Sequence, residues 1–323
     1  MKDLRKYLQF DEKQNDIFIP NEIFEDFKTI KKNHIPFAFS YYYLTNWLYR
    51  YAKYGFVAEL LTQKELKQIL GYSPIYKPVD YLIKKNGVLE QMKYLETTNE
   101  IPTTWEMGHS FQYDISEDLA FNYYEYDAEM NEYGVNFPNR YVIKKPIRAF
   151  TRHVNDEEAQ EDYENDYIDG TFYDVSNTTL IPFEVFLFCM ENEQIGCTGF
   201  YLWSYLKMNN QFYDSGFDIP LEKLAEETGI SKKSLSEYLK LLRKHRMIEV
   251  IHNQEAFVVG LRKEDRKANT YITGDHDFFC EVGDEKVETM KVMTRKEYFE
   301  KLKKEQEERD KKKADIPVDA LPY

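Results

Sequence analysis

Cysteine, glycine and proline are all scarce in this chain of 323 residues. The three cysteines, Cys189, Cys197 and Cys280, include no CxxC pair, which argues against a disulfide framework or a zinc ribbon. Cys189 lies in the apolar run FLFCM, so we expect it to be a small core residue. With 13 glycines and 11 prolines, the chain does not consist mainly of linkers.

Long apolar runs are also missing. No stretch of about 18 apolar residues is present, and no signal-peptide core follows MKDLRKYLQF. We therefore expect a soluble, reduced, cytoplasmic protein that does not enter a membrane.

Catalytic and metal-binding motifs are absent as well. No Walker A, GxGxxG, HExxH or GxSxG pattern occurs, and the six histidines are scattered. Asp275, His276 and Asp277 are the one cluster of metal-ligand types, but adjacent residues rarely share a single ion. The sequence therefore predicts a protein that is not an enzyme and that needs no cofactor and no metal.

Aromatic residues and local charge are abundant. Aromatics make up 16% of the chain, and the length suits two domains of ordinary size. The net charge of −14 is concentrated in two places. Residues 95–139 contain ten acids and no Lys or Arg, and residues 150–175 contain nine acids against Arg152. The remainder is net positive, so the acidity does not exclude nucleic-acid binding elsewhere.

The stretch 216–251 carries the clearest indication of a fold. Leu221, Leu224 and Ala225 are spaced as one side of a short helix, which Gly229 is placed to end. Ser231 is a good N-cap for a second helix. That helix has one apolar face, formed by Leu235, Tyr238, Leu239 and Leu242. Residues 247–251 then have the pattern of a strand.

This order of elements resembles the winged helix-turn-helix family, in which the second helix enters the DNA major groove. The resemblance implies that the groove is met by Ser231, Lys232, Lys233, Ser234, Ser236 and Lys240. Phosphates would be held by Arg243 and Lys244, and by a basic wing with Arg262, Lys263, Arg266 and Lys267. The alternative is a solvated basic helix and a solvated hairpin, since Glu264 and Asp265 lie within that wing.

Self-comparison indicates that this pattern occurs twice. Five blocks recur in the same order: 19–24 with 181–186, an aromatic helix ending at Phe56 with one ending at Phe217, 62–73 with 220–231, 82–90 with 242–250, and 139–141 with 269–271. The predicted fold class is therefore α+β, with two tandem winged helix-turn-helix domains from an internal duplication. One real copy beside an unrelated helical half is the alternative.

The predicted domains are an N-terminal segment (1–19), a first winged-helix domain (20–146), an acidic linker (147–178), a second winged-helix domain (179–273), and a charged helix with a tail (274–323). We expect the linker to be extended or loosely helical. Thr294 and Glu297 are spaced as a capping box at the start of the C-terminal helix, which we expect to be solvated.

The two copies are expected to differ at their second helices and wings. Pro74 and Pro78 interrupt the first copy, so its helix should begin near Pro78 and be shortened or repurposed. Its candidate DNA-binding residues are Tyr76, Lys77, Lys84 and Lys85. Its wing carries an acidic, aromatic insert (95–136) whose alternation predicts extra β-strands facing away from DNA.

The tandem arrangement resembles replication initiators and helicase-loader-type proteins of Gram-positive plasmids and phages. That resemblance implies a sequence-specific double-stranded DNA-binding protein of a mobile element, acting in replication initiation. A transcriptional regulator with the same DNA chemistry is one alternative. Another is an acidic interaction or inhibitor protein on a tandem winged-helix scaffold. A replisome component or other protein could bind the insert at 105–133 or the C-terminal tail, and a homodimer is left open.

Overall fold

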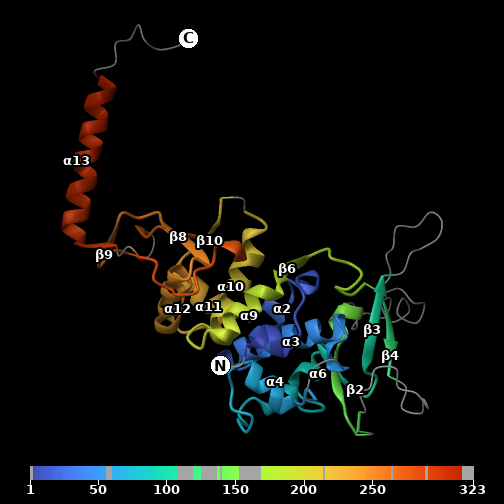
Figure 1. Cartoon of the computed structure of the whole chain (residues 1–323). Coiled ribbons are helices and arrows are strands. Elements are labelled where there is room, and N and C mark those ends of the chain that lie inside the picture. Colours follow the sequence, from blue (N-terminus) through green and yellow to red (C-terminus); the bar gives the residue numbers. More distant parts are fainter. Residues whose placement is uncertain are drawn as a thin grey trace, which may run out of the picture.

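The structure is a computed structural model that describes residues 3–55, 60–107, 119–124, 137–138, 140–152, 169–213, 215–262, 265–287 and 290–314. Its fold is mixed α+β with small sheets, which agrees with the predicted class at that level (Figure 1). Within this part of the chain no helix has the length and apolar character needed to cross a bilayer.

Helices and short strands alternate in both halves of the chain; η denotes a 3₁₀ helix. The first half contains α1 (Leu4–Tyr7), η1 (Glu12–Gln14), β1 (Asp16–Pro20), α2 (Ile23–Asp26), η2 (Phe27–Thr29), η3 (Lys32–His34), α3 (Ile35–Arg50), η4 (Lys53–Gly55), α4 (Gln63–Ile69), α5 (Asp80–Ile83), α6 (Val88–Gln91), β2 (Leu95–Thr98), β3 (Pro102–Met107), β4 (Leu119–Tyr123), β5 (Ile143–Pro146) and α7 (Ile147–Phe150). The second half contains β6 (Thr178–Pro182), α9 (Phe183–Glu191), α10 (Gly196–Asn210), β7 (Phe217–Ile219), α11 (Leu221–Thr228), α12 (Lys232–Lys244), β8 (Ile248–His252), β9 (Ala256–Val259), β10 (Asn269–Thr273), η6 (His276–Phe278), β11 (Lys291–Thr294) and α13 (Arg295–Ala314).

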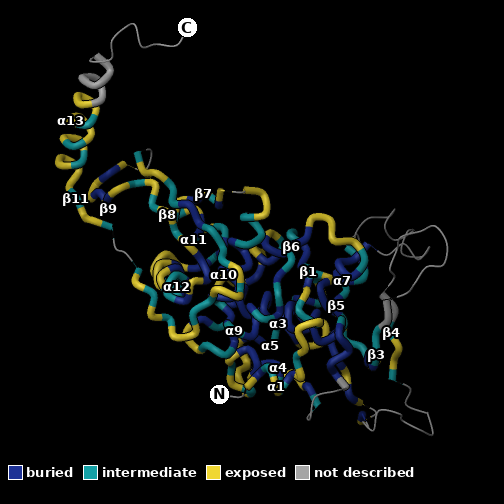
Figure 2. Tube along the Cα trace, turned by 45° about the horizontal axis from the view of Figure 1, so that its top comes forward, coloured by how far each residue is buried: buried dark blue, intermediate teal, exposed yellow. Residues whose placement is uncertain are grey.

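The two aromatic helices, α3 and α10, pack against each other at the centre of the molecule (Figures 1 and 2). Residues 35–49 of α3 are all buried, which fits a helix that is apolar on every side. Phe39 of α3 contacts Phe200 and Tyr201 of α10, with ring centroids 5.6 and 5.5 Å apart. One continuous core therefore joins the two halves.

The strands of the repeated Ile-Pro blocks, β1 and β6, pair with each other in an antiparallel sheet. Phe18 lies opposite Leu180, and each of these residues directly precedes the Ile-Pro pair of its own half. The pairing is thus centred on equivalent positions, which gives it local two-fold symmetry.

The hydrogen bonds that close the two ends of this pairing are also equivalent. The Asn21 N–H donates to the Asn177 carbonyl over 3.1 Å, and the Phe183 N–H donates to the Asn15 carbonyl over 2.7 Å. The Phe183 ring also stacks on Trp47 of the first half at 3.8 Å. The N-terminal segment joins the same unit, since the Leu4 N–H donates to Glu191 over 2.8 Å.

Two of the five predicted repeat blocks are out of register, and both predictions are wrong. The aromatic helices of a third block also end earlier than predicted, α3 at Arg50 and α10 at Asn210, and Phe217 begins β7. Lys93 and Arg246 have positive φ angles of 59° and 56°, and each stands just before the strand β2 or β8. The following residues, Tyr94 and Met247, make the same backbone hydrogen bond, to Leu89 and Leu242 respectively. Residues 89–97, rather than 82–90, therefore occupy the place of 242–250.

The last block is displaced for a similar reason. β5 pairs with β2 as β10 pairs with β8, so β5 is the counterpart of β10. Tyr141 precedes β5, whereas Tyr271 lies inside β10. Asn139, which belongs to the same predicted block, is outside the described residues.

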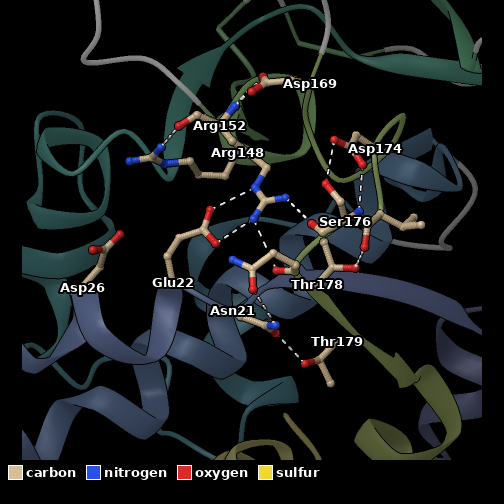
Figure 3. A network of polar contacts seen from close by, with 12 residues as sticks. Asn21, Glu22, Asp26, Arg148, Arg152, Asp169, Asp174, Ser176, Thr178 and Thr179 are labelled. Carbon is tan, nitrogen blue, oxygen red and sulfur yellow. Dashed lines mark hydrogen bonds and ion pairs between the residues drawn. The ribbon is translucent and has the colours of Figure 1, made fainter. Parts of the chain in front are cut away.

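The described ends of the predicted linker lie together, which differs from an extended spacer between domains. The Arg152 N–H donates to Asp169 over 2.8 Å, and the Gly170 N–H donates to the Phe150 carbonyl over 3.0 Å. The Arg152 guanidinium forms a two-pronged ion pair with Glu22, at 3.0 and 2.8 Å, and donates to the carbonyls of residues 176 and 177 (Figure 3). Residues 153–168 are outside the described part.

We expect Arg152→Ala to lower the free energy of unfolding by about 2–3 kcal/mol, because Glu22 and two carbonyls would lose their donor. The matched control is Arg262→Ala, which removes an exposed pair with Asp265 and should cost under about 1 kcal/mol. Urea denaturation of both variants measures the difference, and equal losses would contradict the role given to Arg152.

The predicted extra strands of the acidic insert are present as the antiparallel pair β3–β4. Phe121 of β4 packs on Tyr49 of α3 and on Phe150, with ring centroids 5.3 and 5.8 Å apart. The described part of the insert thus covers its own half, at the opposite end of the molecule from α13 (Figure 1). Most of the predicted contact segment 105–133 lies outside the described residues.

The C-terminal part packs against β9, in the segment between β8 and β10. β11 pairs in parallel with β9, and α13 then projects from the body (Figure 1). The predicted capping box is confirmed, because the Thr294 N–H donates to Glu297 over 2.8 Å and the Glu297 N–H donates to the Thr294 hydroxyl over 3.3 Å. The side chains of α13 that the structure describes are largely exposed, as expected for a solvated helix (Figure 2). The tail at 315–323 is outside the described residues.

Candidate nucleic-acid interface

The second helix-turn-helix has the local structure that its sequence predicts. Gly229 ends α11 with φ 69°, in the left-handed region that favours glycine. The Ser231 hydroxyl caps α12 by accepting a hydrogen bond from the Ser234 N–H over 3.2 Å. Leu235, Leu239 and Leu242 are buried and fix α12 on the core.

The opposite face of α12 is exposed and mostly basic, with Glu237 as the one acid of this helix. Lys232, Lys233, Ser236 and Lys240 are exposed, while Ser234 is half-buried. Among the described residues no carboxylate forms an ion pair with any of these three lysines. Their charge is therefore available to an external anion.

The first turn of α12 concentrates positive charge where a helix disfavours it. The helix dipole places about half a positive charge at its N-terminus, and acidic residues are preferred there. The first turn of α12 contains no acid, but begins with Lys232 and Lys233. A helix N-terminus with free N–H groups and two lysines attracts phosphate, so this arrangement favours binding over stability.

The serine hydroxyls of α12 are engaged in local hydrogen bonds. The Ser231 hydroxyl donates to the Ser234 hydroxyl over 2.9 Å, and the Ser236 hydroxyl donates to the Lys232 carbonyl over 3.0 Å. Each hydroxyl keeps lone pairs with which it can accept a hydrogen bond from a ligand.

The predicted phosphate-binding residues have different surroundings. Arg243 and Lys244 are half-buried, and the segment after β10 lies beside them, since the Glu285 N–H donates to the Lys244 carbonyl over 3.4 Å. On the wing, Arg262 pairs with Asp265 at 3.1 Å and Arg266 with Glu222 at 3.3 Å. Lys267 is exposed, and Lys263 lies outside the described residues.

The first half has no continuous helix in the place of α12. Its second helix is split into α5 and α6, and α5 begins at Asp80, slightly later than the predicted start near Pro78. The loop before α5 is held by Lys67 of α4, which is buried, donates to the Tyr76 carbonyl over 2.8 Å and pairs with Asp80. The segment is shortened, as predicted.

The predicted residues of the first half are accessible but do not form one helix face. Tyr76, Lys77, Lys84 and Lys85 are exposed. The first two lie in the loop before α5, and the other two lie between α5 and α6. The structure therefore brings together the predicted residues of α12 and leaves those of the first half on two separate turns.

Sequence reasoning missed a basic segment of the first half that borders the second helix-turn-helix. A Cβ built on Gly229 would lie 3.4 Å from the Cβ and Cγ atoms of Lys32, which begins η3. The neighbouring Lys28 pairs with Glu227 of α11 at 2.5 Å. Burial opposes the charge of Lys28, but hydrogen bonds to Glu227 and Glu25 outweigh it and raise the pKa of Lys28.

The described residues hold no group of three or more His, Cys, Asp or Glu side chains that could bind a metal ion. Cys197 lines a pocket of about 620 Å³ between the halves, but burial raises the pKa of its thiol to about 12. A thiol with that pKa is protonated at neutral pH and is a poor nucleophile.

No family model, curated protein or solved structure matches this chain. The residues and their geometry therefore carry the functional argument.

Proposed function

We propose that this protein binds double-stranded DNA sequence-specifically through α12, and that it serves replication initiation on a mobile element. The observation that carries the proposal is the exposed lysine face of α12, which begins at a capped helix N-terminus and pairs with no carboxylate in the described part of the chain. Phosphate is the anion that such a face fits best, and lysine and serine side chains at the start of a helix can also reach base edges.

The arrangement of the second half supports a winged-helix domain. Its elements follow the order α10, β7, α11, α12, β8 and β10, and the strands form an antiparallel sheet in the order β7–β10–β8. In such a domain the second helix of the helix-turn-helix, here α12, is the third helix of the domain. It enters the major groove, and the hairpin flanks it. The first half is then a diverged copy with an interrupted third helix and a hairpin insert.

The test is binding of the purified protein to labelled duplexes across a salt series. We expect flank sequences of its own gene to bind more tightly than random sequence, and the affinity to fall steeply with salt. With about six phosphate contacts, affinity drops about a thousandfold between about 50 and 200 mM salt. Absence of binding at about 50 mM salt would refute DNA binding and favour an acidic protein-interaction function.

A transcriptional regulator with the same interface is the second candidate, because nothing in the α12 geometry is specific to replication. Deleting the gene from its element separates the two. Loss of copy number that persists when the neighbouring genes are expressed from an independent promoter supports replication. Full restoration of copy number by that expression supports transcriptional control.

A further inference from the structure

We propose that both halves build the DNA interface around α12, on one side of the molecule only. Lys31 and Lys32, from the first half, bind the phosphates beside the groove that α12 enters. The helix-turn-helix of the first half does not bind DNA. This inference rests on the proposed function and names two residues, Lys31 and Lys32, that the second half does not supply.

The first step is the contact between η3 and the turn before α12. Gly229 carries no side chain, and the stem of Lys32 and the side chain of Ile35 fill the space beside it, at 3.4 and 3.3 Å from the position of a Cβ. Lys232, the first residue of α12, follows only three positions later in the chain. The stem of Lys32 therefore lies beside the turn that leads into α12.

The segment that carries Lys31 and Lys32 is anchored on both sides, while the two ammonium groups are exposed. Lys28, which precedes it, is held by Glu25 and Glu227 at 2.6 and 2.5 Å. After it, buried His34 shares a hydrogen bond with Tyr81 over 3.1 Å. Lys31 and Lys32 lie between these anchors, are exposed, and pair with no carboxylate of the described residues.

His34 adds no third charge to this segment at neutral pH. Burial lowers the pKa of His34, and the nearby charge of Lys31 lowers it further. Two lysines on a rigid 3₁₀ turn are thus presented to solvent next to the first turn of α12. In a helix-turn-helix complex the first helix crosses the DNA backbone. Here that helix is α11, to which Lys28 is tied through Glu227, so the anion nearest to Lys31 and Lys32 is phosphate.

The third step is the contrast with the equivalent place in the other half. The C-terminal end of α4 meets the start of α10 as the end of α11 meets the start of α3, since the Cys197 thiol donates to the Leu70 carbonyl over 3.4 Å. Lys31 and Lys32 precede α3 by the same spacing as Asn192 and Glu193 precede α10.

The first helix-turn-helix is therefore bordered by an acid where the second is bordered by two lysines. Glu193 lines the same pocket as Gly71, at the turn that follows α4. A carboxylate there repels phosphate, and the helix that should follow is broken into α5 and α6. Charge and helix geometry both assign DNA to the side of α12.

The experiment compares two double variants with the same loss of charge in the full-length chain. Lys31→Ala, Lys32→Ala removes the proposed contacts, and Lys84→Ala, Lys85→Ala removes exposed lysines of the first helix-turn-helix. Fluorescence anisotropy with a labelled own-gene duplex gives the slope of log K against log salt. We expect the first variant to reduce the magnitude of the slope by one to two units, at about 0.9 per phosphate, and the second to leave it unchanged.

Each alternative result has a definite meaning. Wild-type protein that binds with a steep salt dependence, together with an unchanged slope in the Lys31, Lys32 variant, overturns the composite interface but keeps the proposed function. An equal loss in the Lys84, Lys85 variant overturns its one-sidedness. Wild-type protein that does not bind DNA overturns both proposals. Thermal melting of each variant controls for unfolding.

Discussion

Trp47→Ala is expected to destabilise both halves of the chain together, by about 3–5 kcal/mol. The Trp47 ring is fully buried and stacks on Phe183 of the second half at 3.8 Å with an interplanar angle of 4°. Its indole N–H donates to the Gln14 carbonyl over 2.7 Å, beside the β1–β6 pair. Truncation would leave a cavity at the junction of the halves and an unpaired carbonyl.

The measurement is urea denaturation in a Trp105→Phe background, in which the Trp47→Ala variant retains Trp203 of α10 as its only tryptophan. Because the halves share one core, Trp203 fluorescence should shift to a lower midpoint although the substitution lies in α3. Phe257→Ala is the control: that ring is 60% exposed, so its loss should change stability by less than about 0.5 kcal/mol. An unshifted Trp203 transition would show that the halves unfold independently.

The packing of the two halves against each other could not be predicted from the sequence. The two aromatic helices and the two Ile-Pro blocks are visible in the sequence, and they indicate two similar halves. That β1 pairs with β6, in a register centred on the equivalent residues Phe18 and Leu180, is a contact between positions more than 150 residues apart. No local sequence pattern encodes the β1–β6 pairing, and the sequence therefore predicts only a linker between the halves.

The candidate site divides in the same way. Gly229, Ser231 and the leucines of α12 act within a few residues of one another, and their predicted roles are confirmed. The predicted match of 82–90 with 242–250 is wrong because it was based on similar residue types. The feature that the two segments share in the structure is a positive φ, at Lys93 and at Arg246, and neither residue type is typical of that conformation. Lys31 and Lys32 escaped notice because their neighbour Gly229 is distant in the chain.

Charge reversal at the start of α12, Lys232→Glu with Lys233→Glu, is expected to lower DNA affinity by about a hundredfold or more while making the protein more stable. Two acids in the first turn would interact favourably with the helix dipole, at about 0.3–1 kcal/mol each. They would also stand near Lys31 and Lys32, which have no carboxylate partner among the described residues. Affinity for a duplex should fall by about tenfold or more for each lysine, since such contacts contribute about 1–3 kcal/mol.

Lys240→Glu separates these two effects. Position 240 lies well beyond the first turn of α12, on the same exposed face, so it should lose DNA affinity without the gain in stability. Melting temperature and anisotropy measured on the same samples give both quantities. A destabilised Lys232, Lys233 variant would mean that these lysines are structural. Higher stability with unchanged DNA affinity would mean that phosphate is bound elsewhere. Higher stability together with lower DNA affinity in the Lys232, Lys233 variant is the result expected of a helix N-terminus that binds an anionic ligand. A site that attracts phosphate must leave its own positive charge uncompensated, which lowers stability.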